Sequence, residues 1–149
     1  MKKQSLRIFV ILSFLAIFAA STAHAQSGGE QTANVPFSFS VGGRTFPAGT
    51  YSVRRLNPQS DRTALSVRSA DGRAGKIVLT LPVQSGAARE SAKLVFNRYG
   101  HQYFLSQVWT TADNAGLELP RSRAERALEQ SGVEGAPERL TVALNPRRK

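Results

Sequence analysis

Apolar and polar residues alternate along much of this chain with a period of two. Between positions 35 and 41, valine or phenylalanine occupies every second position, and Pro36, Ser38 and Ser40 stand between them. Apolar residues alternate with other residues again at Ile77, Leu79 and Leu81. Successive side chains of a strand point to opposite faces, so this period predicts half-buried strands.

The turn signals and one helix signal complete the predicted fold. Gly-Gly at 42–43 and Asp-Gly at 71–72 are dipeptides typical of hairpin turns. Ser122 and Glu125 have capping-box spacing at the start of a helix over 122–131. The sequence predicts an all-β, mainly antiparallel fold, a small barrel or rolled sheet of six to seven strands with this short helix near the C-terminus. A two-sheet β-sandwich is the alternative.

The best-defined predicted hairpin covers residues 94–109. We expect Phe96 on its first strand to share a face with Tyr103, Leu105 and Trp109 on its second, across a two-residue turn. Apolar residues also occur on the reverse side of this hairpin, and such strands are usually covered on both sides. The helix over 122–131 is the predicted cover.

The first 25 residues have the three parts of a secretory signal peptide. Lys2, Lys3 and Arg7 precede an apolar run, and small residues close the segment at Ala23 and Ala25. The run is shorter than the roughly 20 residues of a membrane span, which favours cleavage over an anchor. We expect a periplasmic or secreted protein, divided into signal peptide 1–25, flexible linker 26–33, one β-rich domain 34–144 and basic tail 145–149.

Charge and composition limit the function. The chain has 20 Lys+Arg, 10 Asp+Glu and no cysteine, so disulfides and thiolate sites are excluded. Loss of residues 1–25 would leave 17 basic residues and a net charge of +7. This charge predicts contact with an envelope polyanion. The arginines are spread along the chain without an aromatic recognition motif, so no nucleic-acid partner is expected.

Residues suited to catalysis are scarce. His101, the only histidine after residue 25, stands beside Gly100 in a predicted turn, where a polar ring is solvated. Asp61, Asp71 and Asp113 occur in separate turns, so they give no cluster of oxygen ligands for a metal ion. We therefore expect no catalytic residues, no metal site and no cofactor.

Two groups of residues are candidates for binding. The aromatic residues Phe96, Tyr103, Trp109 and Tyr51 either fill the core or line a cavity for a small apolar ligand or lipid. A second group surrounds the helix and predicts a partner surface. It consists of Leu117, Leu119, Arg121, Arg123 and Leu128.

Three stretches carry a resemblance. They are VPFSFSVGGRTFPAGTYSV at 35–53, LVFNRYGHQYFLSQVW at 94–109 and ELPRSRAERAL at 118–128. They resemble a group of small exported bacterial proteins without assigned function. The resemblance implies export and a single domain that includes 118–128, and it transfers no site residues.

Together these features predict an exported, non-enzymatic β-domain with a binding or structural role in the cell envelope. One alternative is a small-ligand or lipid carrier with an aromatic-lined cavity. The other is a carbohydrate-active enzyme that uses carboxylates alone, which requires two of them to face each other across a cleft.

Overall fold

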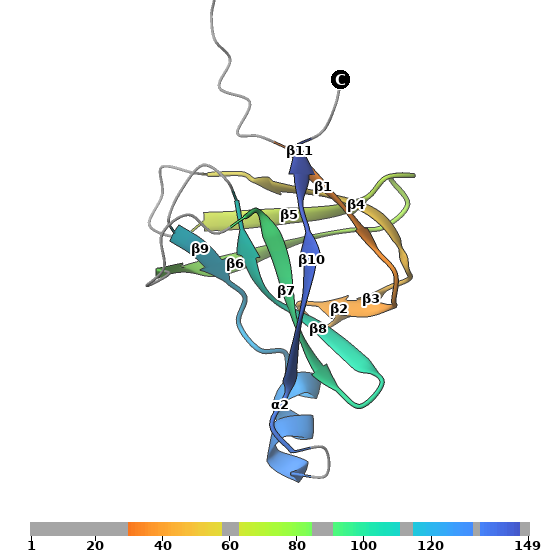
Figure 1. Cartoon of the computed structure of the whole chain (residues 1–149), viewed down its shortest axis with the longest axis vertical. Helices are drawn as coiled ribbons and strands as arrows, with labels where there is room; N and C mark the ends of the chain where they lie inside the picture. The colour runs from red at the N-terminus through yellow and green to blue at the C-terminus, as the bar shows by residue number, and fades with distance from the viewer. Residues whose placement is uncertain (1–29, 58–62, 85–90, 111–114, 133–134, 147–149) are drawn as a thin grey trace, which may run out of the picture.

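The structure is a computed structural model that describes residues 30–57, 63–84, 91–110, 115–132 and 135–146. The predicted signal peptide, Asp61 and Asp113 lie outside these ranges. The described chain is mainly β, with one short helix near the C-terminus (Figure 1). Its elements are β1 (Gln31–Val35), β2 (Phe39–Val41), β3 (Arg44–Phe46), β4 (Gly49–Arg55), β5 (Thr63–Ser69), β6 (Gly75–Gln84), β7 (Lys93–Tyr99), β8 (Gln102–Trp109), β9 (Ala115–Glu118), α2 (Arg123–Ser131), β10 (Glu138–Ala143) and β11 (Asn145–Pro146).

The eleven strands of the described chain form one sheet, which does not close into a barrel. Its order is β10-β7-β8-β9-β6-β5-β4-β1-β11, and the pairs along this path are antiparallel. β2 pairs with β3 and, in parallel, with β8. The predicted mainly antiparallel β fold is confirmed, whereas the closed barrel and the count of six to seven strands are wrong.

Breaks within the alternating stretches raise the number of strands. β1 ends at Val35 and β2 begins at Phe39, although the alternation runs on without interruption. Pro36 has no N–H to donate to a ladder. The hydroxyl of Ser38 donates to the carbonyl of Phe46 at 3.0 Å, which ties this break to β3.

The ends of the domain also differ from the prediction. β1 begins at Gln31, so residues 31–33 belong to the sheet and not to the predicted linker 26–33. β11 pairs with β1 through Asn145 and Pro146, so the first residues of the predicted tail 145–149 are also part of the sheet. The C-terminal segment thereby contacts both ends of the strand order, because β10 pairs with β7.

The predicted helix is confirmed, with Ser122 as its N-cap and Gly132 as its left-handed C-cap. The Ser122 hydroxyl accepts a hydrogen bond from the Glu125 amide at 3.1 Å. The Glu125 side chain is only 3% exposed, and its carboxylate accepts a hydrogen bond from the Asn97 amide of β7 at 2.9 Å. α2 therefore docks on the outer side of the β7–β8 hairpin, beside which it lies in Figure 1.

The core lies on the inner side of the curved sheet and is rich in aromatic rings. The ring centroid of Phe39 lies 5.6 Å from that of Phe46, 4.9 Å from that of Tyr51 and 5.4 Å from that of Phe96. All four side chains are buried. Burial of a large apolar side chain stabilises a fold by about 1.5–3 kcal/mol, so this cluster is a major source of stability.

Candidate functional site

Three of the four aromatic candidates lie in or against one core cluster, and the fourth lies apart from it. Tyr51 and Phe96 are buried in the core cluster. Tyr103 is half-buried and stacks on Phe37, with ring centroids 4.1 Å apart. Trp109 is buried outside that cluster. Phe37 also contacts Phe96 edge to face, with ring centroids 5.2 Å apart, so Tyr51, Phe96 and Tyr103 are packing groups of one core, and a binding hollow must be sought elsewhere.

A bulge in β8 places Trp109 on the opposite face from the one predicted. The register of β7 and β8 shifts between Val95 and Phe96, which leaves Ser106 as an extra residue in β8. A bulge changes which side chains point inward beyond it. Val108 consequently enters the core, and the prediction that Trp109 lies on the core face of this hairpin is wrong.

The indole of Trp109 instead lies on β9. A Cβ atom built on Gly116 would come within 2.8 Å of three indole atoms, so only a glycine permits this approach. The indole N–H donates to the side-chain oxygen of Gln107 at 3.2 Å. Trp109 is therefore fixed by packing and by its polar atom, and it does not mark the mouth of a cavity.

The predicted partner surface is divided between the core and the exterior. Leu117 and Leu119 are 2% and 5% exposed and belong to the core. Leu128 is half-buried, and Arg121 is an exposed residue that pairs with Glu129 at 2.7 Å. Together with Arg121, only Arg123 of the five predicted residues is exposed.

Polar groups are buried beneath α2. The Tyr99 side chain is 2% exposed, and its hydroxyl has no hydrogen-bond partner among the described residues. Burial, and then the negative charge of Glu125, raise the pKa of Tyr99 above its ordinary value. Tyr99 therefore stays protonated near neutral pH and is unsuited to act as a base.

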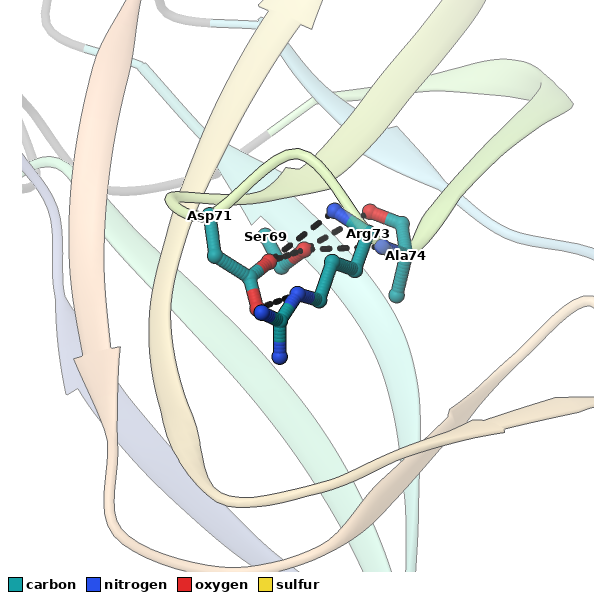
Figure 2. A network of polar contacts seen from close by, with 4 residues as sticks. All are labelled: Ser69, Asp71, Arg73 and Ala74. Atoms are coloured by element: carbon teal, nitrogen blue, oxygen red, sulfur yellow. Dashed lines mark hydrogen bonds and ion pairs between the residues drawn. The ribbon is translucent and has the colours of Figure 1, made fainter.

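The polar network of Figure 2 closes the β5–β6 turn. The Ser69 hydroxyl donates to the Asp71 carboxylate, and the Arg73 amide donates to the same oxygen at 3.0 Å. Ser69 Oγ also accepts a hydrogen bond from the Ala74 amide at 2.9 Å. These bonds lower the pKa of Asp71, with the Ser69 bond as the main cause. His101 is exposed in the separate β7–β8 turn, so within the described residues no histidine accompanies this serine.

A polar hollow of about 330 Å³ adjoins this turn and includes Glu30 and Asp71 in its lining. A carboxylate pair for glycoside hydrolysis needs one partner that stays protonated, which requires a raised pKa. The pKa of Asp71 is shifted in the opposite direction, because its charged form accepts hydrogen bonds from Ser69 and Arg73. Asp71 is therefore unsuited to be the protonated partner of such a pair.

A more apolar groove opens where β6 changes its partner. Residues 75–80 of β6 pair with β5, and residues 81–84 pair with β9. Beyond β9 the chain turns toward β8, where the Leu119 amide donates to the Ser106 carbonyl at 2.8 Å. The space left beside β6, here called the β6 groove, measures about 530 Å³. Its lining is Gly42, Gly43, Val78, Leu79, Leu119, Pro120, Arg121, Ser122, Arg123 and Arg126.

Two arginines of this groove lack partners within the described chain. Neither Arg123 nor Arg126 has a side-chain hydrogen bond or ion pair with another described residue. Both stand in the first turn or so of α2, where the helix dipole disfavours positive charge. Their position therefore gains nothing from the helix dipole, and it places two positive charges on the α2 side of an apolar floor.

β6 also carries a row of outward apolar residues, here called the apolar ridge. Ile77, Leu79 and Leu81 are 60%, 59% and 62% exposed, while Val78 and Thr80 point inward. The alternation in this strand thus identifies the wrong face as buried. The ridge is the set of exposed large hydrophobic residues in the described ranges.

Comparisons with protein-family models, with curated proteins and with solved structures give no match for this chain. The resemblance to small exported bacterial proteins therefore stays a prediction. Within the described ranges, no three acidic, histidine or cysteine side chains lie close enough together to hold a metal ion. No helix of the described chain has the length and apolar character needed to cross a membrane.

Sequence reasoning identified Arg121 and Arg123 but missed the β6 groove and the apolar ridge. The groove depends on the change of partner within β6, which the local residue pattern does not indicate. The one available hint was the length of the stretch from Gly75 to Gln84, which at ten residues exceeds the other strands. A long strand is able to pair with different neighbours along its two parts.

Proposed function

We propose that this chain is an exported, non-enzymatic binding protein of the cell envelope, and that the β6 groove binds an amphipathic anion. Such a ligand has an apolar chain that ends in a carboxylate or phosphate group. The observation that carries this proposal is an apolar groove flanked by Arg123 and Arg126, neither of which is neutralised by a described residue.

The size and floor of the groove support an apolar ligand. Val78, Leu79, Leu119 and Pro120 supply carbon surface, and the lining contains no aspartate or glutamate. Small-molecule sites are typically clefts of about 300–1,000 Å³ with mostly apolar walls and a few polar groups. The volume of about 530 Å³ lies within this range.

The charges support an anionic head group. A guanidinium group donates two parallel hydrogen bonds to a carboxylate or phosphate, and such charge-assisted bonds are stronger than neutral ones. Arg121 is already committed to Glu129, which leaves Arg123 and Arg126 for the ligand. The overall excess of 20 basic over 10 acidic residues would also attract an anion to the protein.

Calorimetric titration with dodecanoate below its micelle concentration tests the proposal. We expect saturable binding, weaker binding of hexanoate because its chain is shorter, and no binding of dodecyltrimethylammonium because its head group is cationic. Arg123→Gln/Arg126→Gln should weaken dodecanoate binding by about ten-fold or more.

The matched control is Arg54→Gln/Arg139→Gln, which removes the same net charge from residues that do not line the groove. It should bind dodecanoate like the unmodified chain. Equal affinity in both double variants, or equal affinity for the anionic and cationic probes, would refute the proposal.

A further inference from the structure

We infer that the outer face of β6 docks onto the surface of a membrane that carries anionic head groups. The inference goes beyond ligand binding in the groove, because Ile77 and Leu81 of the apolar ridge do not line the groove. Leu79 is the residue that the two features share.

The ridge has the shape of an interfacial contact. Alternate residues of a strand project from the same face about 6.6–6.8 Å apart, so the three side chains form a row roughly 13 Å long. Each of them is about three-fifths exposed. A contiguous exposed apolar patch on a folded domain marks an interaction surface more often than isolated apolar residues do. Aliphatic side chains in such a row are able to enter the boundary between head groups and acyl chains.

Positive charge lies on both sides of the ridge. On one side, cross-strand pairs connect Ile77 to Ser66 of β5 and Ser66 to Arg54 of β4, which places Arg54 about 10 Å from the ridge on the same face. Arg68 of β5 is exposed on this face as well. Neither arginine has an ion pair with a residue in the described ranges.

On the other side, Arg123 and Arg126 border the groove that Leu79 helps to line. Three carboxylates lie near this face: Glu118 of β9 is exposed and pairs with Leu81, and Glu30 and Asp71 line the polar hollow that Arg68 also lines. Four arginines near the ridge, Arg54, Arg68, Arg123 and Arg126, have no ion pair with a described residue, which fits contact with an anionic surface.

Charge also distinguishes a membrane from a second copy of the chain. A two-fold contact through the ridge would bring the same patch of each copy together. A second copy would bring its own excess of basic residues to this contact, so it complements the arginines beside the ridge less well than an anionic surface does. An anionic lipid surface covers the same apolar row and complements the arginines beside it.

Vesicle co-sedimentation of the purified full chain tests the inference, with vesicles of equal parts phosphatidylglycerol and phosphatidylcholine compared with phosphatidylcholine alone. We expect binding to the anionic vesicles only, and weaker binding at high salt because exposed charges are screened. Every variant retains residues 1–29, so any contribution of that segment is the same throughout.

Ile77→Thr/Leu81→Thr should reduce partitioning about ten-fold or more, since two inserted aliphatic groups are lost. Threonine suits an exposed strand position, and the thermal melt of this variant should match that of the unmodified chain. Arg54→Gln should reduce partitioning by about five-fold. Arg139→Gln, on β10 four strands from β6, should leave partitioning unchanged.

Absence of binding to anionic vesicles would overturn the inference, as would full binding by the Ile77→Thr/Leu81→Thr variant. Equal effects of Arg54→Gln and Arg139→Gln would also contradict it, even if the ridge variant failed to fold. Sedimentation velocity of the unmodified chain and of the ridge variant measures whether the ridge mediates a dimer. A dimer that the ridge variant converts to a monomer would assign the ridge to a second copy and refute the membrane contact.

Discussion

The contact between Trp109 and Gly116 makes a sharp test of the β8 bulge. In Gly116→Ala, the new methyl group would lie 2.8 Å from three atoms of the indole, well inside normal carbon contact distance. The indole is 8% exposed and is held by Gln107, so it has little room to move aside. Overpacking of this kind typically costs about 1–3 kcal/mol.

A double-mutant cycle separates this clash from any effect on the backbone. Gly116 does not adopt a positive φ that would disfavour alanine, so the loss should come from the indole alone. In a Trp109→Ala background, Gly116→Ala should therefore be neutral or stabilise the protein by about 0.5–1 kcal/mol, since alanine suits a strand interior better than glycine. Trp109→Ala itself should cost about 3–5 kcal/mol.

Urea unfolding followed by circular dichroism measures all four proteins, including those without the only tryptophan. The coupling free energy between the two positions should be at least about 1 kcal/mol. If Gly116→Ala is harmless in the unmodified chain, or equally costly without the indole, the placement of Trp109 on β9 is wrong. In that case the bulge at Ser106 would not place Trp109 on the outer face of the sheet.

Three further substitutions probe stability. Ser122→Ala should cost about 1 kcal/mol in urea unfolding, because the Glu125 amide loses its cap. Asn97→Ala should cost about 1–3 kcal/mol, because the buried Glu125 carboxylate loses a donor, and a melt unchanged from the unmodified chain would contradict that role. Asp71→Asn should destabilise the protein above about pH 4. The difference should vanish on acidification, because the lowered pKa of Asp71 gives stability that is lost as pH falls through its folded-state value.

The sequence predicted those features that depend on neighbouring residues. The Ser122 cap and the Gly-Gly and Asp-Gly turns depend on local hydrogen bonds and backbone preferences, and the structure contains them. The Glu125 carboxylate, however, accepts a hydrogen bond from Asn97 of β7 and does not complete the capping box. Tyr99 pairs with Gln102, so the β7–β8 turn has two residues. A turn of this length is the one predicted from the apolar faces of the two strands.

The wrong predictions have one cause: they concern contacts between residues that are far apart in the sequence. β8 carries apolar residues on both faces, and the bulge at Ser106 shifts its register against β7. The Leu119 amide donates to the Ser106 carbonyl, which the bulge displaces from that ladder. A bulge of this type is set by the partner strands. No residue near Ser106 indicates the bulge, so the sequence alone does not determine on which face of the sheet Trp109 lies.

The outward direction of the apolar ridge follows from contacts on the other face of β6. The side chain of Val78 lies so close to the β2–β3 turn that a Cβ atom on Gly42 would come within 2.7 Å of it. The Thr80 hydroxyl is buried and donates to the Thr63 carbonyl at 2.7 Å. A slip of one residue would bury the ridge but expose Val78 and leave buried polar groups without partners. The register is therefore fixed from the inside, and Ile77, Leu79 and Leu81 remain exposed unless a partner covers them.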